Sequence, residues 1–550
     1  MNKFIFVSGG VCSSLGKGVA ASSIGALLES RGLNVRMVKC DPYINANASM
    51  NLDEHGEVYV TDDGAETDLD LGNYARFTSG QLSKANSMTT GQVYKSVIER
   101  ERSGGYSGRC VQVIPHITDE IKNRIMAAAK EDPDTDVVII EIGGTVGDIE
   151  SIPFLEAARQ MIHELGRKNA VSVHLTLIPE VAVGEMKTKP TQHSVKSMQE
   201  MGIQPDILIC RSPVMLDEPT RRKIALFTNV DLDAVFTSPN IETTIYKVPI
   251  VFSEQKLDQV VLKKMGVESR HADMKPWLSV MKRFAARKGK VRIGIVGRYM
   301  ELHDAYKSLY EALFHAGLEC AVEVELVKID SVTLEETEDV NTILGHGAHD
   351  ETDVKNLNGI LIPDGFDQKG INGMLKAVAW ARLNKIPYLG ICLGMHIMVI
   401  DWARNILNWS DADSSELNPS TKHPVIIKGK MRLGASETLI EEGTHIFAAY
   451  SLSKDSSLSK DSGEKRIFER HRNHCEFSNQ YRKEISESGL KIAAVTPDES
   501  AADSSFVDCV EWTEHPWGVG VQFHPEYKSK PTAASPLFRD FIAAAKKNRG

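Results

Sequence analysis

The sequence lacks several features that would place it in a specialised class of protein. Its eight cysteines form no Cys-x-x-Cys pair, so they indicate neither a zinc site nor a disulfide scaffold, and we expect a reducing, cytoplasmic environment. No apolar run reaches the roughly 18 residues that a membrane helix needs, and the N-terminus shows no secretory signal pattern. Lys and Arg number 64 against 74 Asp and Glu. With this net charge of −10, we expect neither a nucleic-acid nor a membrane partner.

The composition is that of an ordinary globular protein long enough for at least two large domains. Of the 550 residues, 42% are hydrophobic and 25% are charged. Short, nearly continuous apolar runs alternate with helix-like stretches such as Val19–Glu29 and Ile121–Lys130, which favours parallel sheets covered on both faces. The expected strands are Phe4–Ser8, Asn34–Cys40, Val137–Ile142, Val171–Ile178 and Asp206–Cys210 in the first half, and Val291–Val296, Val322–Ile329, Gly359–Pro363, Ile386–Ile391 and Val519–Phe523 in the second.

A basic stretch with little strand pattern separates the two sets of strands. It spans Val251–Gly289, and we interpret it as a helical linker. We therefore predict an α/β chain of two domains, 1–265 and 291–550, joined by a linker at 266–290. Ser451–Lys465 contains a tandem repeat, Ser-Leu-Ser-Lys-Asp-Ser, that cannot build a core, so we expect an exposed, mobile loop there.

A glycine-rich turn lies between the first expected strand and the first expected helix. It reads Ser8-Gly-Gly-Val-Cys-Ser-Ser-Leu-Gly-Lys17-Gly18. Backbone N–H groups in such a turn approach phosphate oxygens, the helix N-terminus favours their charge, and Lys17 can reach the terminal phosphates. Gly18 stands where a P-loop usually has a magnesium-binding hydroxyl. We therefore expect carboxylates to hold the metal ion.

Acidic and basic clusters supply candidate ligands for a metal ion and a triphosphate. Glu141 ends a predicted strand, at the edge where open α/β sheets bind ligands. The other candidate carboxylates are Asp62, Asp63, Asp68 and Asp70. Three further clusters look directed at a ligand: Lys39–Tyr43, Gly147–Glu150 and Lys187–His193. The last of them places two lysines beside hydroxyl groups, which suits a triphosphate.

A nucleophile motif lies in the second half. Gly390-Ile-Cys392-Leu-Gly394 joins an expected strand to an expected helix, Met395–Ala403. The glycines permit the sharp turn that exposes a nucleophile, and the helix N-terminus favours a thiolate. His524-Pro-Glu526 follows another expected strand. Cys392, His524 and Glu526 therefore form a candidate nucleophile, base and orienting carboxylate.

These motifs carry a family resemblance over almost the whole chain. The second half resembles class I glutamine amidotransferases, and the first half resembles the P-loop-like, dethiobiotin-synthetase-like amidoligases. In this order the chain resembles CTP synthases, through the glycine-rich turn, Asp41-Pro-Tyr-Ile-Asn45, Asp63–Leu71, Glu141–Glu150 and Lys187–Ser194.

The resemblance implies that ATP phosphorylates UTP, that glutamine is hydrolysed at Cys392, and that the ammonia passes internally to give CTP. It implies ATP binding by Ser14, Leu15, Gly16, Lys17, Gly18, Val19, Asp70 and Ile241, with Mg²⁺ on Asp70 and Glu141. It implies UTP and CTP binding by Ser13, Asp148, Ile149, Glu150, Lys187, Thr188, Lys189, Pro190, Thr191, Gln192 and Lys223. It implies glutamine binding by Gly365, Leu393, Glu416 and Arg472.

The resemblance also implies regulation and assembly. CTP is expected to inhibit, GTP to activate, and the subunits to form a homotetramer that polymerises into filaments. His55 and Ser107-Gly108 match the region thought to gate ammonia entry. One departure concerns the glutaminase, because Asp364 stands where the family usually has a glycine. We expect its backbone conformation and its charge beside the developing oxyanion to lower glutaminase efficiency.

Two other functions fit the same motifs. One is a different ATP-dependent amidotransferase that acts on a carboxylate, as cobyrinate amidases do. The other is a regulatory or filament-forming relative with a weakened glutaminase, a hypothesis that Asp364 motivates. UTP-dependent ATP hydrolysis would distinguish a CTP synthase from the carboxylate amidotransferase. A low yield of CTP would distinguish the regulatory relative from an active CTP synthase.

Overall fold

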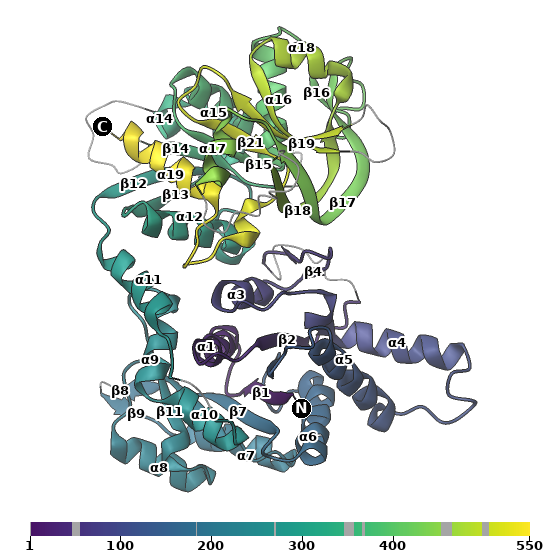
Figure 1. Cartoon of the computed structure of the whole chain (residues 1–550), viewed down its shortest axis with the longest axis vertical. Helices are drawn as coiled ribbons and strands as arrows, with labels where there is room; N and C mark the ends of the chain where they lie inside the picture. The colour runs from purple at the N-terminus through teal and green to yellow at the C-terminus, as the bar shows by residue number, and fades with distance from the viewer. Residues whose placement is uncertain are drawn as a thin grey trace. The chain divides into compact units, whose positions relative to one another are not determined.

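The computed structural model describes residues 2–46, 56–182, 184–268, 271–345, 357–365, 369–452, 465–497 and 505–549. The chain divides into two compact units. Figure 1 shows their helices and strands, coloured by residue number. One comprises residues 1–49 and 66–281, and the other comprises 50–65 and 282–550. A short segment from the first part of the sequence therefore belongs, by its contacts, to the second unit.

The first unit is built on a seven-stranded parallel sheet in the order β11-β10-β7-β1-β6-β2-β5. Its central strands are buried along their length, as expected where helices cover both faces. The strands are β1 (Lys3–Gly9), β2 (Val35–Asp41), β5 (Ser87–Thr89), β6 (Val137–Ile142), β7 (Ala170–Leu177), β10 (Ile207–Ser212) and β11 (Val235–Pro239). A separate short hairpin pairs β8 (Glu180–Ala182) with β9 (Glu185–Met186).

Helices α1 and α3 position the residues of the glycine-rich turn and the acidic cluster. α1 (Lys17–Ser30) packs against α3 (Asp70–Phe77) and against α9 (Val248–Glu254). The other helices of this unit are α4 (Thr90–Arg102), α5 (Thr118–Lys130), α6 (Ile152–Leu165), α7 (Lys189–Glu200), α8 (Glu218–Thr228), α10 (Leu257–Met265) and α11 (Lys275–Ala285). The last of these extends to the start of the second unit.

The second unit is built on a ten-stranded mixed sheet. Strands β13, β12, β14, β15 and β21 are parallel, and β20, β19, β17 and β18 continue the sheet in antiparallel pairs. The strands are β12 (Lys290–Gly297), β13 (Glu323–Asp330), β14 (Gly359–Ile362), β15 (Tyr388–Ile391), β16 (Asp413–Ser414), β17 (Pro424–Ile440), β18 (Arg466–Phe477), β19 (Leu490–Pro497), β20 (Ser505–Trp512) and β21 (Gly518–Val521). Its main helices are α12 (Lys307–Glu319), α15 (Ile371–Leu383), α16 (Leu393–Asn405), α17 (His445–Ser451), α18 (Arg482–Glu487) and α19 (Pro536–Asn548).

The α/β architecture confirms the fold class expected from the sequence. Each of the ten expected strands is present, and the stretch Val251–Gly289 is largely helical. The repeat at Ser451–Lys465 lies mostly outside the described residues, as does His55. In the described part of the chain, no helix is both long and apolar enough to cross a membrane.

Candidate functional site

The glycine-rich turn of the first unit has the strand–turn–helix arrangement expected for a phosphate-binding turn. It leaves β1 and enters α1, and Ser14 and Gly16 have positive φ angles of 55° and 91°. The Nζ atom of Lys17 donates to the backbone oxygen of Gly144 at 2.8 Å, which holds the side chain over the turn. Burial lowers the pKa of Lys17. A partly desolvated lysine at the start of a helix is well placed to bind phosphate oxygens.

A close contact with Asp70 favours glycine at position 18, directly after Lys17. A Cβ atom at Gly18 would lie 2.5 Å from Oδ1 of Asp70, the first residue of α3. The Asp70 carboxylate thus occupies the space beside α1 that a hydroxyl-bearing side chain would otherwise enter. This is consistent with the expectation that carboxylates, and not a P-loop hydroxyl, serve the metal ion here.

Three carboxylates surround one buried lysine at the carboxyl ends of neighbouring strands. Lys39 on β2 pairs with Asp70, with Oε1 of Glu141 at 3.2 Å and with Oδ1 of Asp41 at 3.6 Å. Glu141 lies on β6 opposite Lys39 in the register of the sheet, and its other oxygen accepts from the hydroxyl of Tyr74. Hard oxygen ligands converging on one cationic atom are what Mg²⁺ requires, so this donor set fits the metal ion expected here.

The charges of this cluster shift one another's pKa values. Burial raises the pKa of Asp41 and of Glu141. Burial also disfavours ionisation of Asp70, but the Lys39 ammonium outweighs it and lowers the pKa of that carboxyl. For Lys39, burial is outweighed by Asp70 and the other carboxylates, which raise its pKa. The lysine therefore stays charged and holds the acids together.

The residues expected to bind UTP and CTP lie on several elements of the first unit. Lys187 and Thr188 precede α7, and Lys189, Pro190, Thr191 and Gln192 form its first turn. Asp148 directly precedes the short 3₁₀ turn that contains Ile149 and Glu150, whereas Lys223 lies on α8. Ser13 belongs to the glycine-rich turn, and Ile241 follows β11. Ser107 and Gly108 are exposed after α4.

A buried histidine links β1 to α7, and no sequence pattern predicted it. Nδ1 of His174 lies 2.9 Å from the Ser8 hydroxyl on β1, and Nε2 lies 2.8 Å from the Ser194 hydroxyl on α7. Burial lowers the pKa of His174 to about 3, so the ring is neutral and acts as a fixed bridge. This histidine lies in β7, within an apolar run. The sequence around a single polar residue in such a run does not indicate which residues it contacts.

The thiol of the second unit sits on a sharp turn between β15 and α16. Cys392 has φ 52° and ψ −101°, a conformation that is costly for a non-glycine residue and typical of a nucleophile elbow. A Cβ atom at Gly394 would lie 2.3 Å from the backbone oxygen of Ile362, so only glycine lets α16 approach β14 this closely. The elbow predicted from the glycine spacing is present.

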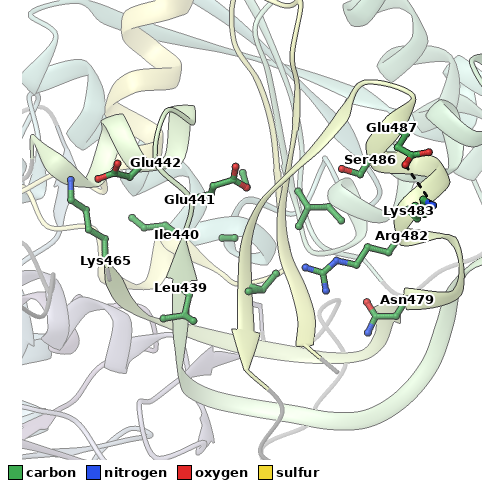
Figure 2. A pocket seen from close by; sticks show the side chains of 14 residues that line it. Leu439, Ile440, Glu441, Glu442, Lys465, Asn479, Arg482, Lys483, Ser486 and Glu487 are labelled. Carbon is green, nitrogen blue, oxygen red and sulfur yellow. Dashed lines mark ion pairs between the residues drawn. The ribbon is translucent and has the colours of Figure 1, made fainter. Parts of the chain in front are cut away.

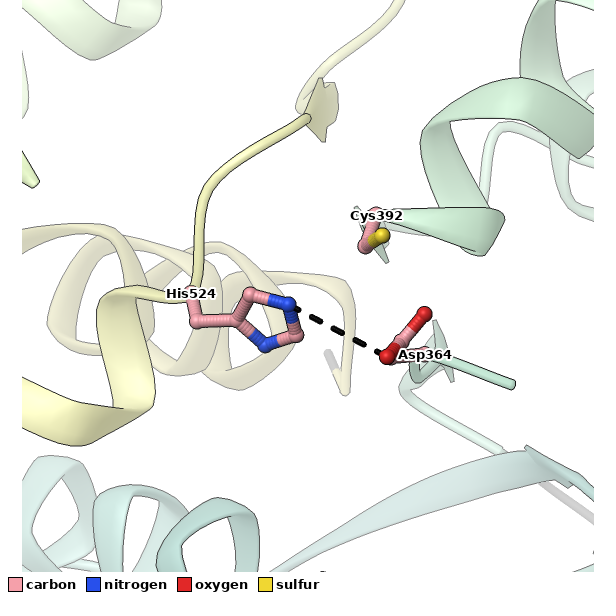
Figure 3. Close-up of side chains that lie close together, drawn as sticks. All are labelled: Asp364, Cys392 and His524. Atoms are coloured by element: carbon pink, nitrogen blue, oxygen red, sulfur yellow. Dashed lines mark ion pairs between the residues drawn. The ribbon is translucent and has the colours of Figure 1, made fainter. Parts of the chain in front are cut away.

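Neighbouring parallel strands bring three chemically active side chains to one edge of the sheet. Asp364 follows β14, Cys392 follows β15 and His524 follows β21, and one ligand-type atom from each lies within 4.8 Å of the others (Figure 3). Nδ1 of His524 pairs with Oε1 of Glu526 at 2.8 Å. On the opposite side of the ring, Nε2 lies 4.0 Å from Oδ2 of Asp364. The imidazole is therefore held between two carboxylates, with the thiol close by.

Burial and charge set the protonation of the thiol and the imidazole. Burial raises the pKa of Cys392 well above its usual value, and the nearby Asp364 carboxylate raises it further. For His524, burial is outweighed by Glu526 and Asp364, so the pKa of the imidazole is raised. Asp364 is not among the described non-glycine residues with positive φ. The turn therefore accepts an aspartate without left-handed strain, and its charge is what bears on the thiol.

All four residues expected to bind glutamine line one cavity with the thiol. The cavity has a volume of about 120 Å³. Its walls include Cys392 and the predicted set Gly365, Leu393, Glu416 and Arg472. Glu416 pairs with Nε2 of His474 at 2.8 Å and accepts from the Cys475 thiol at 3.1 Å. These contacts fix a carboxylate on the cavity wall, where the amino group of an amino acid could pair with it.

Two further residues of this site were missed from the sequence. Nε2 of Gln522 lies 3.5 Å from the Cys392 sulfur, and its Oε1 lies 2.8 Å from Nε2 of His396, another residue of the cavity wall. Gln522 lies two residues before His524, so its closeness to that motif could have indicated a role. His396 lies in the first turn of α16, where the sequence resembles any buried helix.

The segment 56–65 contacts the elements that carry His524. The Tyr59 hydroxyl donates to the backbone oxygen of Tyr527 at 3.1 Å and accepts from the Arg470 guanidinium at 2.6 Å. The Tyr527 ring stacks on His524 with centroids 5.1 Å apart. Asp62, a candidate metal ligand by sequence, instead pairs with Arg470 at 2.6 Å. This segment therefore braces the elements around the imidazole.

A second, larger cavity of about 800 Å³ lies elsewhere in the same unit (Figure 2). Its wall includes charged residues of both signs, among them the pair Lys483 and Glu487, whose charged atoms are 3.9 Å apart. None of the residues predicted to act in catalysis or binding lines this cavity.

Known proteins resemble the chain along its whole length. The family "CTP synthase N-terminus" matches residues 3–267, and "Glutamine amidotransferase class-I" matches residues 301–544. A CTP synthase of Hydrogenobaculum is 46% identical over 99% of this chain and 98% of its own length, and one of Carboxydothermus hydrogenoformans is 48% identical over 100% and 99%. The solved glutaminase domain of a Trypanosoma brucei CTPS with bound acivicin is 32% identical, covers 47% of this chain and 94% of its own, and has a TM-score of 0.41. By its identity to full-length relatives, the chain belongs to the CTP synthase family and is a glutamine-hydrolysing carbon–nitrogen ligase.

Proposed function

We propose that this chain forms CTP from UTP, with ATP as the energy source and glutamine as the nitrogen donor. The assignment gives residues 1–265 to the synthetase, 266–290 to a linker and 291–550 to the glutaminase. The observation that carries it is the cavity in which Cys392 meets the four predicted glutamine-binding residues. Family membership supports the substrates ATP, UTP and glutamine.

In the first step, the γ-phosphoryl group of ATP moves to O4 of UTP, which turns a poor leaving group into a good one. The turn from Ser14 to Val19 holds the ATP phosphates, with Lys17 on the terminal ones and Ile241 near the nucleoside. Asp70 and Glu141 would hold Mg²⁺, which supplies charge neutralisation for phosphoryl transfer. Lys39 keeps both carboxylates in place through its ion pairs.

The acceptor site is assigned to the residues around the start of α7. UTP is bound by Ser13, Lys223 and the run Lys187, Thr188, Lys189, Pro190, Thr191 and Gln192, with the lysines on its triphosphate. Asp148, Ile149 and Glu150 contact the base and sugar of bound CTP. CTP shares the triphosphate part of this site, so it inhibits by competition with UTP.

In the second unit, glutamine is hydrolysed through a covalent intermediate. His524 takes the thiol proton of Cys392, the sulfur attacks the amide carbon, and the protonated imidazole returns that proton to the departing ammonia. Glu526 holds the imidazole through the 2.8 Å bond to Nδ1. Water then attacks the thioester, releases glutamate and restores the thiol. Gly365, Leu393, Glu416 and Arg472 hold the substrate during both steps.

Ammonia passes internally to phosphorylated UTP and displaces phosphate at C4. This path keeps the phosphorylated intermediate away from water. By the same resemblance, GTP activates the glutaminase, and the enzyme works in the cytoplasm as a homotetramer that forms filaments.

The test is an absorbance assay for CTP from UTP, ATP and Mg²⁺, with glutamine plus GTP in one arm and ammonium chloride in the other. We expect product in both arms. Product with ammonia alone would support a synthetase with an impaired glutaminase, the alternative that Asp364 favours. Product in neither arm would overturn the proposed function.

A further inference from the structure

Three side chains around the nucleophile have the chemistry of a zinc site. Sulfur, imidazole nitrogen and carboxylate oxygen are the three donor types that Zn²⁺ takes in proteins. Cys392, His524 and Asp364 each place one such atom within 4.8 Å of the other two (Figure 3). In a tetrahedral zinc site the ligand atoms are roughly 3.3–3.8 Å apart, given zinc–ligand distances of roughly 2.0–2.3 Å. Inward shifts of the side chains by about 1 Å would therefore suffice.

Two of the three side chains have a polar atom without a hydrogen-bond partner in the described part of the chain. Within the described residues, Nε2 of His524 and Oδ1 of Asp364 are buried without a hydrogen-bond partner. The side chain of His524 is only 2% exposed. Both atoms can therefore serve as metal ligands without the loss of an existing hydrogen bond.

The contacts of His524 are those of a typical metal-binding histidine. Nδ1 is engaged by Glu526 at 2.8 Å, which leaves Nε2 directed toward Cys392 and Asp364. A carboxylate on the far nitrogen is the usual outer partner of a zinc-binding histidine. The cavity of about 120 Å³ beside Cys392 and Asp364 leaves room for a water molecule as the fourth ligand.

A second group of the same kind fits less well. Glu416, His474 and Cys475 also lie within 4.8 Å of one another. Their atoms, however, already bond among themselves, with His474 at 2.8 Å and the Cys475 thiol at 3.1 Å from Glu416. Glu416 is also more exposed than any ligand of the first group.

We propose that Cys392, His524 and Asp364 bind a thiophilic divalent cation, represented by Zn²⁺, and that this cation reversibly inhibits glutamine hydrolysis. On binding, the thiol proton leaves to solvent and the sulfur becomes a metal-bound thiolate. Thiolate and carboxylate together neutralise the two positive charges. The metal covers the sulfur that must attack glutamine. The proposal rests on the proposed glutaminase only for this inhibition, since binding itself needs no activity.

Binding is tested on the full-length protein with Co²⁺ alone as the probe. We expect the absorption of thiolate-to-cobalt charge transfer, absent in Cys392→Ala and retained in the matched control Cys475→Ser. Because Asp364→Gly removes one ligand, we expect cobalt affinity to fall about tenfold or more. Asp364→Asn keeps the size of the side chain and serves as a second variant. Circular dichroism and thermal unfolding of each variant, compared with the wild type, report whether the protein is folded.

Inhibition is tested by adding Zn²⁺ in excess Mg²⁺ and then a chelator. Glutamine-dependent synthesis should fall with Zn²⁺ and recover with the chelator, while ammonia-dependent synthesis should persist. Asp364→Gly should need about tenfold more zinc for the same inhibition.

The proposal is overturned if the wild type shows no thiolate absorption, if Cys475→Ser abolishes it, or if Asp364→Gly binds cobalt as tightly as the wild type. If the glutaminase proved inactive, the proposed function would be wrong. The cobalt-binding result would still test the metal site.

Discussion

At the scale of single residues, Asp364 is the residue whose charge bears most directly on the thiol of Cys392. Its carboxylate faces both Cys392 and His524. A negative charge beside a buried thiol disfavours the thiolate, and the pKa of Cys392 is raised by burial first and by Asp364 second. The thiolate that the proposed mechanism requires is therefore scarce in the neutral range, and its share grows as the pH rises toward this pKa.

Replacement of Asp364 by glycine should remove the charge that raises the pKa of Cys392. We expect Asp364→Gly to shift the rise of glutaminase activity to lower pH, and to increase turnover near neutrality by about tenfold for each pKa unit removed. The measurement is glutamate release between about pH 6 and pH 9, a range that brackets the thiol's ordinary pKa. Asp364→Asn, which removes the charge and keeps the size, should shift the profile in the same direction. An unchanged profile in both variants would remove the role assigned to this charge.

At the scale of structural elements, the junction of β1, α1 and α3 is the part of the first unit to which we assign phosphate and metal binding. The two helices approach closely at Gly18, where a Cβ atom would lie 2.5 Å from Oδ1 of Asp70. We expect Gly18→Ala to displace Asp70 and lower CTP synthesis at least about tenfold with either nitrogen source, because both need phosphoryl transfer. Parallel assays with glutamine and ammonia check this. A variant that loses only the glutamine-dependent reaction would contradict it.

The segment 56–65 is a second element with a testable role. The Tyr59 hydroxyl joins it to Tyr527 and Arg470, and the backbone of Arg470 accepts from the His524 amide at 2.8 Å. Tyr59→Phe removes these buried bonds at a cost of about 1–3 kcal/mol. We expect glutamine-dependent synthesis to fall while ammonia-dependent synthesis persists, and the two rates are measured side by side.

Tyr527→Phe provides the matched variant for this test. It removes the bond from the Tyr527 hydroxyl to the backbone oxygen of Val58 at 3.0 Å, on the same segment. Both substitutions should lower the same activity. Equal losses with glutamine and ammonia would indicate a general loss of stability and would contradict a specific role for this segment.

The elements that could be predicted from the sequence are those with local patterns. The apolar runs that became β1, β6 and β15 and the glycine spacing around Cys392 depend on neighbouring residues, so they can be read from the chain. The long antiparallel strands β17 and β18 were not predicted, because their exposed faces carry many charged residues and show no continuous apolar run. The contacts of segment 56–65 were also missed, since Asp62 and Arg470 are 408 residues apart in sequence and carry no local signal.

At the scale of the whole molecule, the proposed function divides two kinds of chemistry between the two units. Phosphoryl transfer is assigned to the cluster around Lys39, and amide hydrolysis to the edge of the sheet that carries Cys392. Each set of residues lies within one unit of the fold. Loss of one set should therefore leave the chemistry of the other intact.

Cys392→Ala is the sharpest test of that division. Removal of the sulfur prevents the thioester, so glutamine-dependent CTP synthesis should fall to background. Free ammonia needs no thioester, because it only has to displace phosphate from phosphorylated UTP, so synthesis with ammonium chloride should stay close to the wild-type rate. The two reactions are compared in one preparation by the absorbance of CTP. Because alanine fits the space of the buried thiol, a folded variant that fails with both nitrogen sources would show that the two units do not work as separable catalysts.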